Sequence, residues 1–190
     1  MTTSTHKPPS EPLGIVQAWM HTASAQRSMA QLVARTVADT LAAQIPGAAY
    51  LTLTIQEEDT PRDRELFPAT VRDAAGQILF AFEDELPALG SEHVELRAQW
   101  GDLDPDDAFA LRTLLRWLYI AGAVFDHFPT DLLGEDDDAE EDMLCLPLSQ
   151  QARPERAHVE GEDHWGVETR RLRPYPTEQH QATSGVGAVQ

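Results

Sequence analysis

The spacing of apolar residues changes abruptly in the first third of the chain, and this change constrains the fold most. Between residues 25 and 45 apolar side chains recur about every fourth position, which predicts an amphipathic helix. From residue 50 to 56 apolar and polar residues alternate, which predicts a half-buried strand. Pro46-Gly47 lies between the two patterns and favours the end of the helix.

The helical pattern begins near Leu13, after three prolines in the first twelve residues. It is long enough for one helix of about eight turns, and a second interpretation divides it into two helices near Ser24. Two short apolar runs follow, at 69–72 and 78–82, and Gly76 lies in the turn between them. They predict a hairpin in which the glycine takes a left-handed conformation. Residues 57–68 are expected to form a charged loop.

Residues 94–100 alternate between apolar and polar side chains, which predicts a fourth strand. A second helix is expected next, with Asp104 as its N-cap and Pro105 as its first residue. The apolar pattern predicts that this helix extends to about His127. The stretch 117–125 is uncharged throughout, and such a helix is usually covered by protein. This predicts a homodimer or a complex with a less acidic partner.

The predicted order is therefore helix, four strands, helix. It indicates an α+β domain over residues 12–130, with an antiparallel sheet of about four strands flanked by an N-terminal and a C-terminal helix. Residues 1–11 and 149–190 are expected to be disordered polar or acidic tails, and 131–148 an acidic linker. Helix-flanked antiparallel sheets support many functions, so the architecture alone indicates none.

The net charge of -18 is concentrated in one part of the chain. Residues 57–142 hold 24 acidic and six basic side chains, and the densest block is 135–142. Such a block usually forms a solvated linker, and the alternative is a docking surface for a basic partner. The charge argues against direct binding to nucleic acid or to an anionic membrane.

An isolated apolar run, 143–148, follows the acidic block. It either docks on another protein's sheet or groove, or returns to its own domain as a fifth strand. If it docks, the partner-binding residues are Glu135, Asp136, Asp137, Asp138, Met143, Leu144, Leu146 and Leu148. The only basic cluster, 170–173 with Pro174 after it, either folds back onto the acidic block or serves as a short peptide ligand.

Tests for catalytic and metal sites give no match. Asp102, Asp104 and Asp106 form D-x-D-x-D, but a calcium loop would need glycine and glutamate where Asp107 and Thr113 stand. A phosphatase-like aspartate would need a later lysine, and Lys7 is the only lysine. The seven histidines lack metal-ligand spacing, and the acidic neighbours of Cys145 disfavour a reactive thiolate. We therefore expect no catalytic residue, no cofactor and no metal.

The sequence predicts a non-enzymatic acidic protein-interaction module, acting as an adaptor, a chaperone-like protein or a regulator, with a protein partner whose surface is basic. No apolar run reaches the roughly 20 residues of a membrane span, and no signal-peptide core is found, so we expect a cytoplasmic location. One alternative is a nucleic-acid mimic that inhibits a DNA-binding protein. A second is a ligand sensor or enzyme with an unrecognised pocket, bordered by Asp102, Asp104, Arg112 or Arg116.

Overall fold

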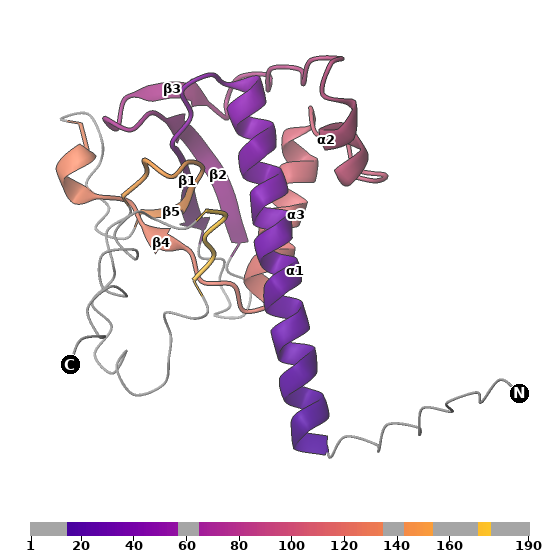
Figure 1. The fold of residues 1–190 in the computed structure, drawn as a ribbon. Helices are drawn as coiled ribbons and strands as arrows, with labels where there is room; N and C mark the ends of the chain where they lie inside the picture. Colours follow the sequence, from indigo (N-terminus) through magenta and orange to yellow (C-terminus); the bar gives the residue numbers. More distant parts are fainter. Residues whose placement is uncertain (1–14, 57–64, 135–142, 154–170, 176–190) are drawn as a thin grey trace, which may run out of the picture.

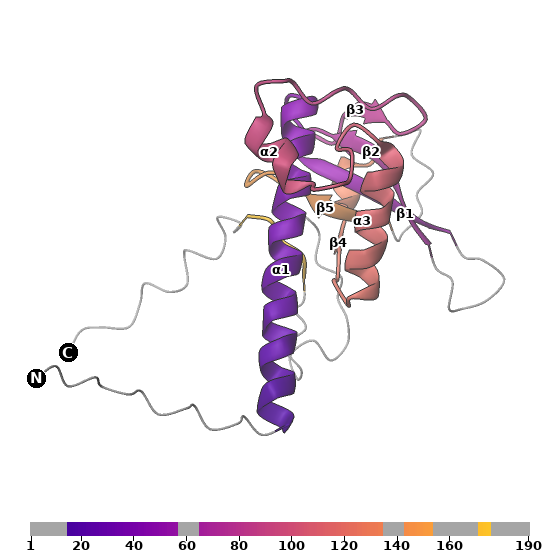
Figure 2. The same cartoon turned by 90° about the vertical axis from the view of Figure 1, so that its right-hand side faces the viewer.

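In the part of the chain that the structure describes, five antiparallel strands form one sheet, and three α-helices lie on one of its faces (Figures 1 and 2). The computed structural model describes residues 15–56, 65–134, 143–153 and 171–175. The strand order is β3-β2-β1-β5-β4. The predicted α+β class, with an antiparallel sheet flanked by helices, is confirmed.

Helix α1 spans Ile15–Gln44 and is continuous, so it does not break near Ser24. Its C-terminal half packs on the sheet, where Ala34, Val37 and Leu41 are buried. Its N-terminal half extends past the sheet and past the other helices (Figures 1 and 2). Residues 24–29 are accordingly exposed on every side of the helix.

The central strand, β1, spans Tyr50–Gln56 and has partners on both sides. On one side it pairs with β2, Glu65–Arg72, which pairs in turn with β3, Ile78–Ala81. On the other side it pairs with β5, Leu144–Pro147, and β4, Asp126–His127, forms the edge beyond. The run after the acidic block is therefore a fifth strand, which lies inside its own sheet between β1 and β4.

Strand β2 begins earlier than the sequence predicts and contains Pro68. The register with β1 shifts at this point, because Leu53 is opposite Pro68 whereas Thr52 is opposite Thr70. Strand β3 pairs with β2 only from Thr70 onward, so the missing proline N–H interrupts no bond to β3. Proline is tolerated in a strand at such a bulge, and the prediction of a loop over 57–68 is wrong from residue 65.

The predicted turn between β2 and β3 is confirmed. Gly76 has φ +86°, and the Asp73 carboxylate accepts hydrogen bonds from the Ala75 and Gln77 amides, both at 2.9 Å. A Cβ at position 76 would lie 2.4 Å from the Leu132 carbonyl oxygen. Glycine is therefore required here both by its φ and by the close approach of the segment after β4.

The predicted fourth strand, 94–100, is wrong. Residues Val94–Gln99 form a short helix, α2, in which no side chain is fully buried and Val94 is 69% exposed. Only Trp100, directly after the helix, enters the core. Alternation over seven residues cannot exclude one and a half helical turns, and Glu, Leu, Arg, Ala and Gln all favour helix.

Helix α3, Ala108–Ile120, starts later and ends earlier than predicted. Its N-cap is Asp107, which accepts from the Phe109 amide at 2.9 Å; the predicted cap, Asp104, lies in the preceding turn. The helix ends because Gly122 has φ +81°, and the amides of Gly122 and Ala123 donate to the carbonyls of Tyr119 and Leu118. This pattern of hydrogen bonds is a Schellman motif, which ends the helix and directs the chain toward β4.

Two apolar clusters lie on opposite faces of the sheet. The larger lies between the sheet and the helices, and its largest members are Leu41, Leu51, Leu53, Leu66, Leu111, Leu115 and Leu146. The smaller, on the other face, comprises Ala49, Tyr50, Phe128, Cys145 and Ala152. The segments after β4 and β5 cover it, and the Tyr50 hydroxyl accepts from the Arg153 amide at 2.9 Å.

The described part of the C-terminal region also belongs to the domain. Leu172 is 2% exposed and joins the main core, and Arg171 is buried. The prediction of a tail without structure from residue 149 onward therefore does not apply to 149–153 and 171–175. Within the described residues, no helix has both the length and the apolar character needed to cross a membrane.

Candidate functional site

Of the eight predicted partner-binding residues, four lie in the apolar run that forms β5. Leu146 and Leu148 are buried in the main core, at 0% and 2% exposure, so they contact their own domain and cannot reach a partner. Leu144 is half-buried and pairs with β1 and β4. Met143 is half-buried, and its carbonyl accepts from the Phe128 amide at 2.8 Å.

The run thus takes the second of its two predicted alternatives. Strand β5 pairs with β1 along its whole length and with β4 at Leu144 and Cys145, so neither of these two residues has a free backbone edge to add to another protein's sheet. Glu135, Asp136, Asp137 and Asp138 lie outside the described residues. Their contact with a basic partner remains a prediction.

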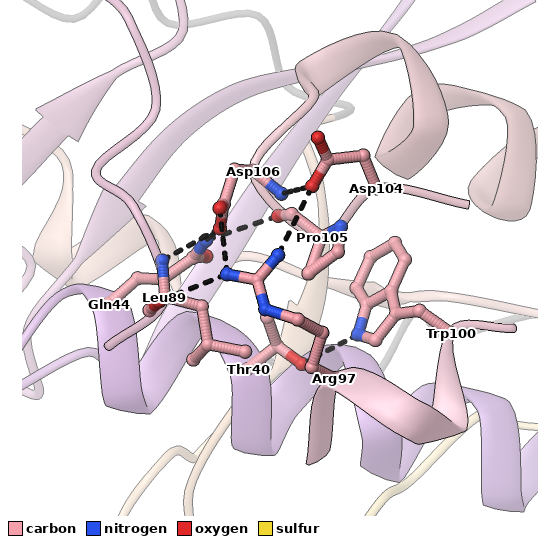
Figure 3. Close-up of polar contacts among 8 residues, drawn as sticks. All are labelled: Thr40, Gln44, Leu89, Arg97, Trp100, Asp104, Pro105 and Asp106. Atoms are coloured by element: carbon pink, nitrogen blue, oxygen red, sulfur yellow. Dashed lines mark hydrogen bonds and ion pairs between the residues drawn. The ribbon is translucent and has the colours of Figure 1, made fainter. Parts of the chain in front are cut away.

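The three aspartates of the D-x-D-x-D motif do not point into a common site. Asp106 accepts hydrogen bonds from the Leu89 amide at 2.7 Å and from the Gln44 side-chain amide at 3.1 Å (Figure 3). Arg97 donates to Asp106 at 2.8 Å and lies 3.5 Å from Asp104. Asp102 is exposed.

These contacts explain the ionisation of Asp106. Partial burial alone would raise the pKa of its carboxyl, but the hydrogen bonds from Leu89 and Arg97 outweigh burial, so the pKa lies below its ordinary value. The ionised carboxylate joins α1, α2 and the segments before each of α2 and α3. Its hydrogen bonds therefore hold these elements of the fold together (Figure 3).

The candidate nucleophile Cys145 is also enclosed by the fold. Cys145 is 0% exposed. Burial raises the pKa of its thiol well above the ordinary value, and Asp126 raises it further. Among the described residues, no group of three His, Cys, Asp or Glu side chains is arranged to hold a metal ion.

A surface that the sequence indicated only in part is the outer face of α3. Five side chains at helical spacing form it: Phe109, Thr113, Arg116, Trp117 and Ile120. Phe109, Trp117 and Ile120 are 69%, 61% and 70% exposed. The opposite face packs on the sheet through Leu111, Leu115 and Leu118. Arg112, at the border, stacks over the Phe67 ring at 3.8 Å.

The sequence indicated an uncharged stretch over 117–125 but placed all of it in one helix. Because α3 ends at Ile120, Ala123 and Phe125 leave the helix and are buried in the core. Phe109 lies on the same face of α3, about two helical turns before Trp117, and completes the exposed apolar strip. Helical spacing from Phe109 would have identified it once the helix end at Gly122 was known.

A second grouping, around Asp126, was missed by sequence reasoning. Asp126 is 0% exposed, and it accepts hydrogen bonds from Arg171 at 2.9 Å and from two nitrogens of Arg173 at 3.2 Å. The sequence left two alternatives for the basic cluster 170–173, folding back onto the acidic block or serving as a short peptide ligand, and residues 135–142 lie outside the described residues. In the structure Arg171 and Arg173 pair with a buried carboxylate on β4, and no local pattern indicated this pairing.

Comparisons with protein families, with curated proteins and with solved structures found no match to this chain. The candidate surfaces therefore rest on the geometry of this molecule alone.

Proposed function

We propose that the chain is a non-enzymatic protein-interaction module that binds a protein with a basic surface through the outer face of α3. The observation that carries the proposal is the exposure of Phe109, Trp117 and Ile120 on one helical face, at 61–70%. Full burial of a large apolar side chain contributes roughly 1.5–3 kcal/mol. Aromatic side chains of this kind are frequent anchors of protein interfaces.

The electrostatics favour a basic partner over a second copy of the chain. Eight exposed acidic residues precede or begin α3, against one arginine in the same stretch, Arg97: they are Glu83, Asp84, Glu85, Glu92, Glu95, Asp102, Asp104 and Asp107. A second copy would bring the same charge of -18. Complementary charge steers association and selects the partner.

The proposal is tested by photo-crosslinking in the source cells. The photoreactive residue benzoylphenylalanine replaces Trp117 or Ile120, and a matched control places it at Ala74, an exposed position in the turn before β3. We expect one predominant basic protein to crosslink at positions 117 and 120 and not at 74. Calorimetry with that purified protein should then show binding that weakens with salt.

Two outcomes would contradict the proposal. Equal crosslinking at position 74 would show that contact is non-specific. Crosslinks only to a second copy, together with a dimer in sedimentation equilibrium, would identify a homodimer face. A crosslinked DNA-binding protein whose interaction is competed by DNA would support the proposal and would identify the chain as a nucleic-acid mimic.

A further inference from the structure

The segment Arg171–Tyr175 lies on the domain in the manner of a bound peptide. Residues 154–170 separate it from the preceding described segment. Arg171 forms a parallel bridge with Val124, and the Leu172 amide donates to the Val124 carbonyl at 2.8 Å. The segment therefore lies along the chain directly before the edge strand β4, held by one bridge and one main-chain hydrogen bond. Pro174 has no N–H, so this addition ends after a few residues.

Side chains of the segment alternate between two kinds of contact. Arg171 and Arg173 both donate to the Asp126 carboxylate, which is 0% exposed. Leu172 is 2% exposed and packs in the main core. Main-chain bonds at a sheet edge, with specific pockets for the side chains, are a recurring mode of peptide recognition.

The end of the segment contacts α1. The Tyr175 hydroxyl donates a hydrogen bond to Asp39, and the guanidinium of Arg35 lies 5.2 Å from the centre of the Tyr175 ring. A pocket of about 410 Å³ opens beside the tyrosine, lined by Leu148, Ser149, Gln150, Gln151 and Tyr175. This pocket leaves room for a further side chain beyond the five residues that are bound.

We propose that the sheet edge at Val124 and Asp126 is a binding site for an extended peptide of the pattern Arg-apolar-Arg-Pro-aromatic from a partner protein. The chain's own residues 171–175 occupy this site as an intramolecular competitor. The site is distinct from the outer face of α3 and does not depend on it. A peptide without the two arginines would leave the buried Asp126 carboxylate unpaired, which is strongly unfavourable.

Residues 171–175 are covalently connected to the domain, and this connection determines how strongly they compete with a partner peptide. A tethered segment of this kind acts at an effective concentration on the order of millimolar. A partner peptide must therefore bind more tightly than the segment itself or be presented at high local concentration. The additional pocket beside Tyr175 offers a contact that the bound five residues leave unused.

The test uses the full chain with a protease recognition sequence inserted between residues 154 and 170. The probe is a fluorescein-labelled synthetic peptide of residues 169–177, and its anisotropy reports binding at physiological salt. After cleavage we expect saturable binding of the peptide, and at least tenfold weaker binding to the uncut chain. Replacing both arginines of the peptide by glutamine should weaken binding at least tenfold.

A scrambled peptide of the same composition controls for general attraction to an acidic protein. Equal binding of the scrambled and the native peptide would overturn the proposal. It would also be overturned if the cut chain lost its cooperative unfolding, or if the cleaved fragment stayed bound without exchange, because the segment would then be a permanent part of the core. Substitutions in the peptide leave the domain unchanged, so misfolding cannot mimic loss of binding.

Discussion

The indole nitrogen of Trp100 donates a hydrogen bond of 2.9 Å to the hydroxyl of Thr40, which joins the end of α2 to α1 (Figure 3). Both side chains are buried, at 6% and 1% exposure. The Thr40 hydroxyl donates in turn to the Thr36 carbonyl at 2.7 Å. Trp100 therefore fixes α2 on the helical layer, although α2 itself contributes no fully buried side chain.

We expect Trp100→Phe to lower the free energy of unfolding by about 1 kcal/mol through the lost hydrogen bond, in addition to a smaller packing loss. Trp100→Ala should lower it by about 3–5 kcal/mol, because a cavity forms as well. Urea denaturation followed by circular dichroism measures both values. The matched control is Trp117→Ala on the outer face of α3, where exposure of 61% predicts a change within about 0.5 kcal/mol.

The Asp106 carboxylate predicts a specific pH dependence. Its pKa in the folded protein lies below the ordinary value of 3.8, so its contribution to stability is present above that value and is lost as the pH falls through the folded pKa. Asp106→Asn should lower the free energy of unfolding by about 1–3 kcal/mol at neutral pH. The difference from the wild type should shrink in acid.

The control is Asp104→Asn, since the Asp104 side chain is 63% exposed and lies 3.5 Å from Arg97. Exposed ion pairs contribute little. Thermal unfolding of the three proteins between neutral and acidic pH gives the comparison. An Asp106→Asn deficit that stays constant with pH would show that the carboxylate's charge is not what stabilises this junction.

Substitutions at two nearby positions on α3 should distinguish an effect on stability from an effect on binding. Leu118 is 5% exposed and Ile120 is 70% exposed. Leu118→Asp should prevent folding, because an unpaired buried carboxylate costs several kcal/mol, a large part of a domain's total of about 5–15 kcal/mol. Ile120→Asp should melt like the wild type yet weaken binding of the crosslinked partner at least tenfold. A stable Leu118→Asp protein would contradict the position of α3 in the core.

The elements that the sequence predicted correctly are those with strong local signals. Helix α1, strand β1 and the Gly76 turn combine a clear apolar period with a nearby Pro or Gly. The limits of α3 were wrong, because Asp104 and Asp107 are both acceptable caps, and the capping role of Gly122 depends on its positive φ. Nothing local distinguishes the two choices.

Pairing between distant segments was harder to predict. The alternation in residues 94–100 suggested a strand, but this segment is helical. The strand that completes the sheet, β5, begins at Leu144, far along the chain from Tyr50 where β1 begins. The sequence left two alternatives for that run, because its apolar residues suit a partner's groove as well as a sheet interior. The bond between Asp126 and Arg171 spans 45 positions and could not be inferred without coordinates.

Cys145 provides a simple probe of the sheet. It is the only cysteine of the chain, it is 0% exposed at the centre of β5, and burial raises the pKa of its thiol. We expect a thiol reagent to modify the native protein at least about 100-fold more slowly than the denatured protein, because reaction requires opening of the sheet. Fast modification in native buffer would show that β5 is not held between β1 and β4.

Tyr175 tests whether the C-terminal segment lies on α1 in solution. Burial, followed by the hydrogen bond to Asp39, raises the pKa of Tyr175 to about 12. Because this folded-state pKa lies above the ordinary value of 10.0, the contact stabilises the fold below pH 10 and its contribution is lost as the pH rises toward 12. Tyr175→Phe should lower the free energy of unfolding by about 1 kcal/mol at neutral pH, and this deficit should vanish in strong alkali. In an ultraviolet titration of phenolate, the variant should lose the ionisation near pH 12. If Tyr175 ionised near pH 10 in the wild type, the segment would not be seated against Asp39, and the proposed peptide site at Asp126 would lose one of its anchors.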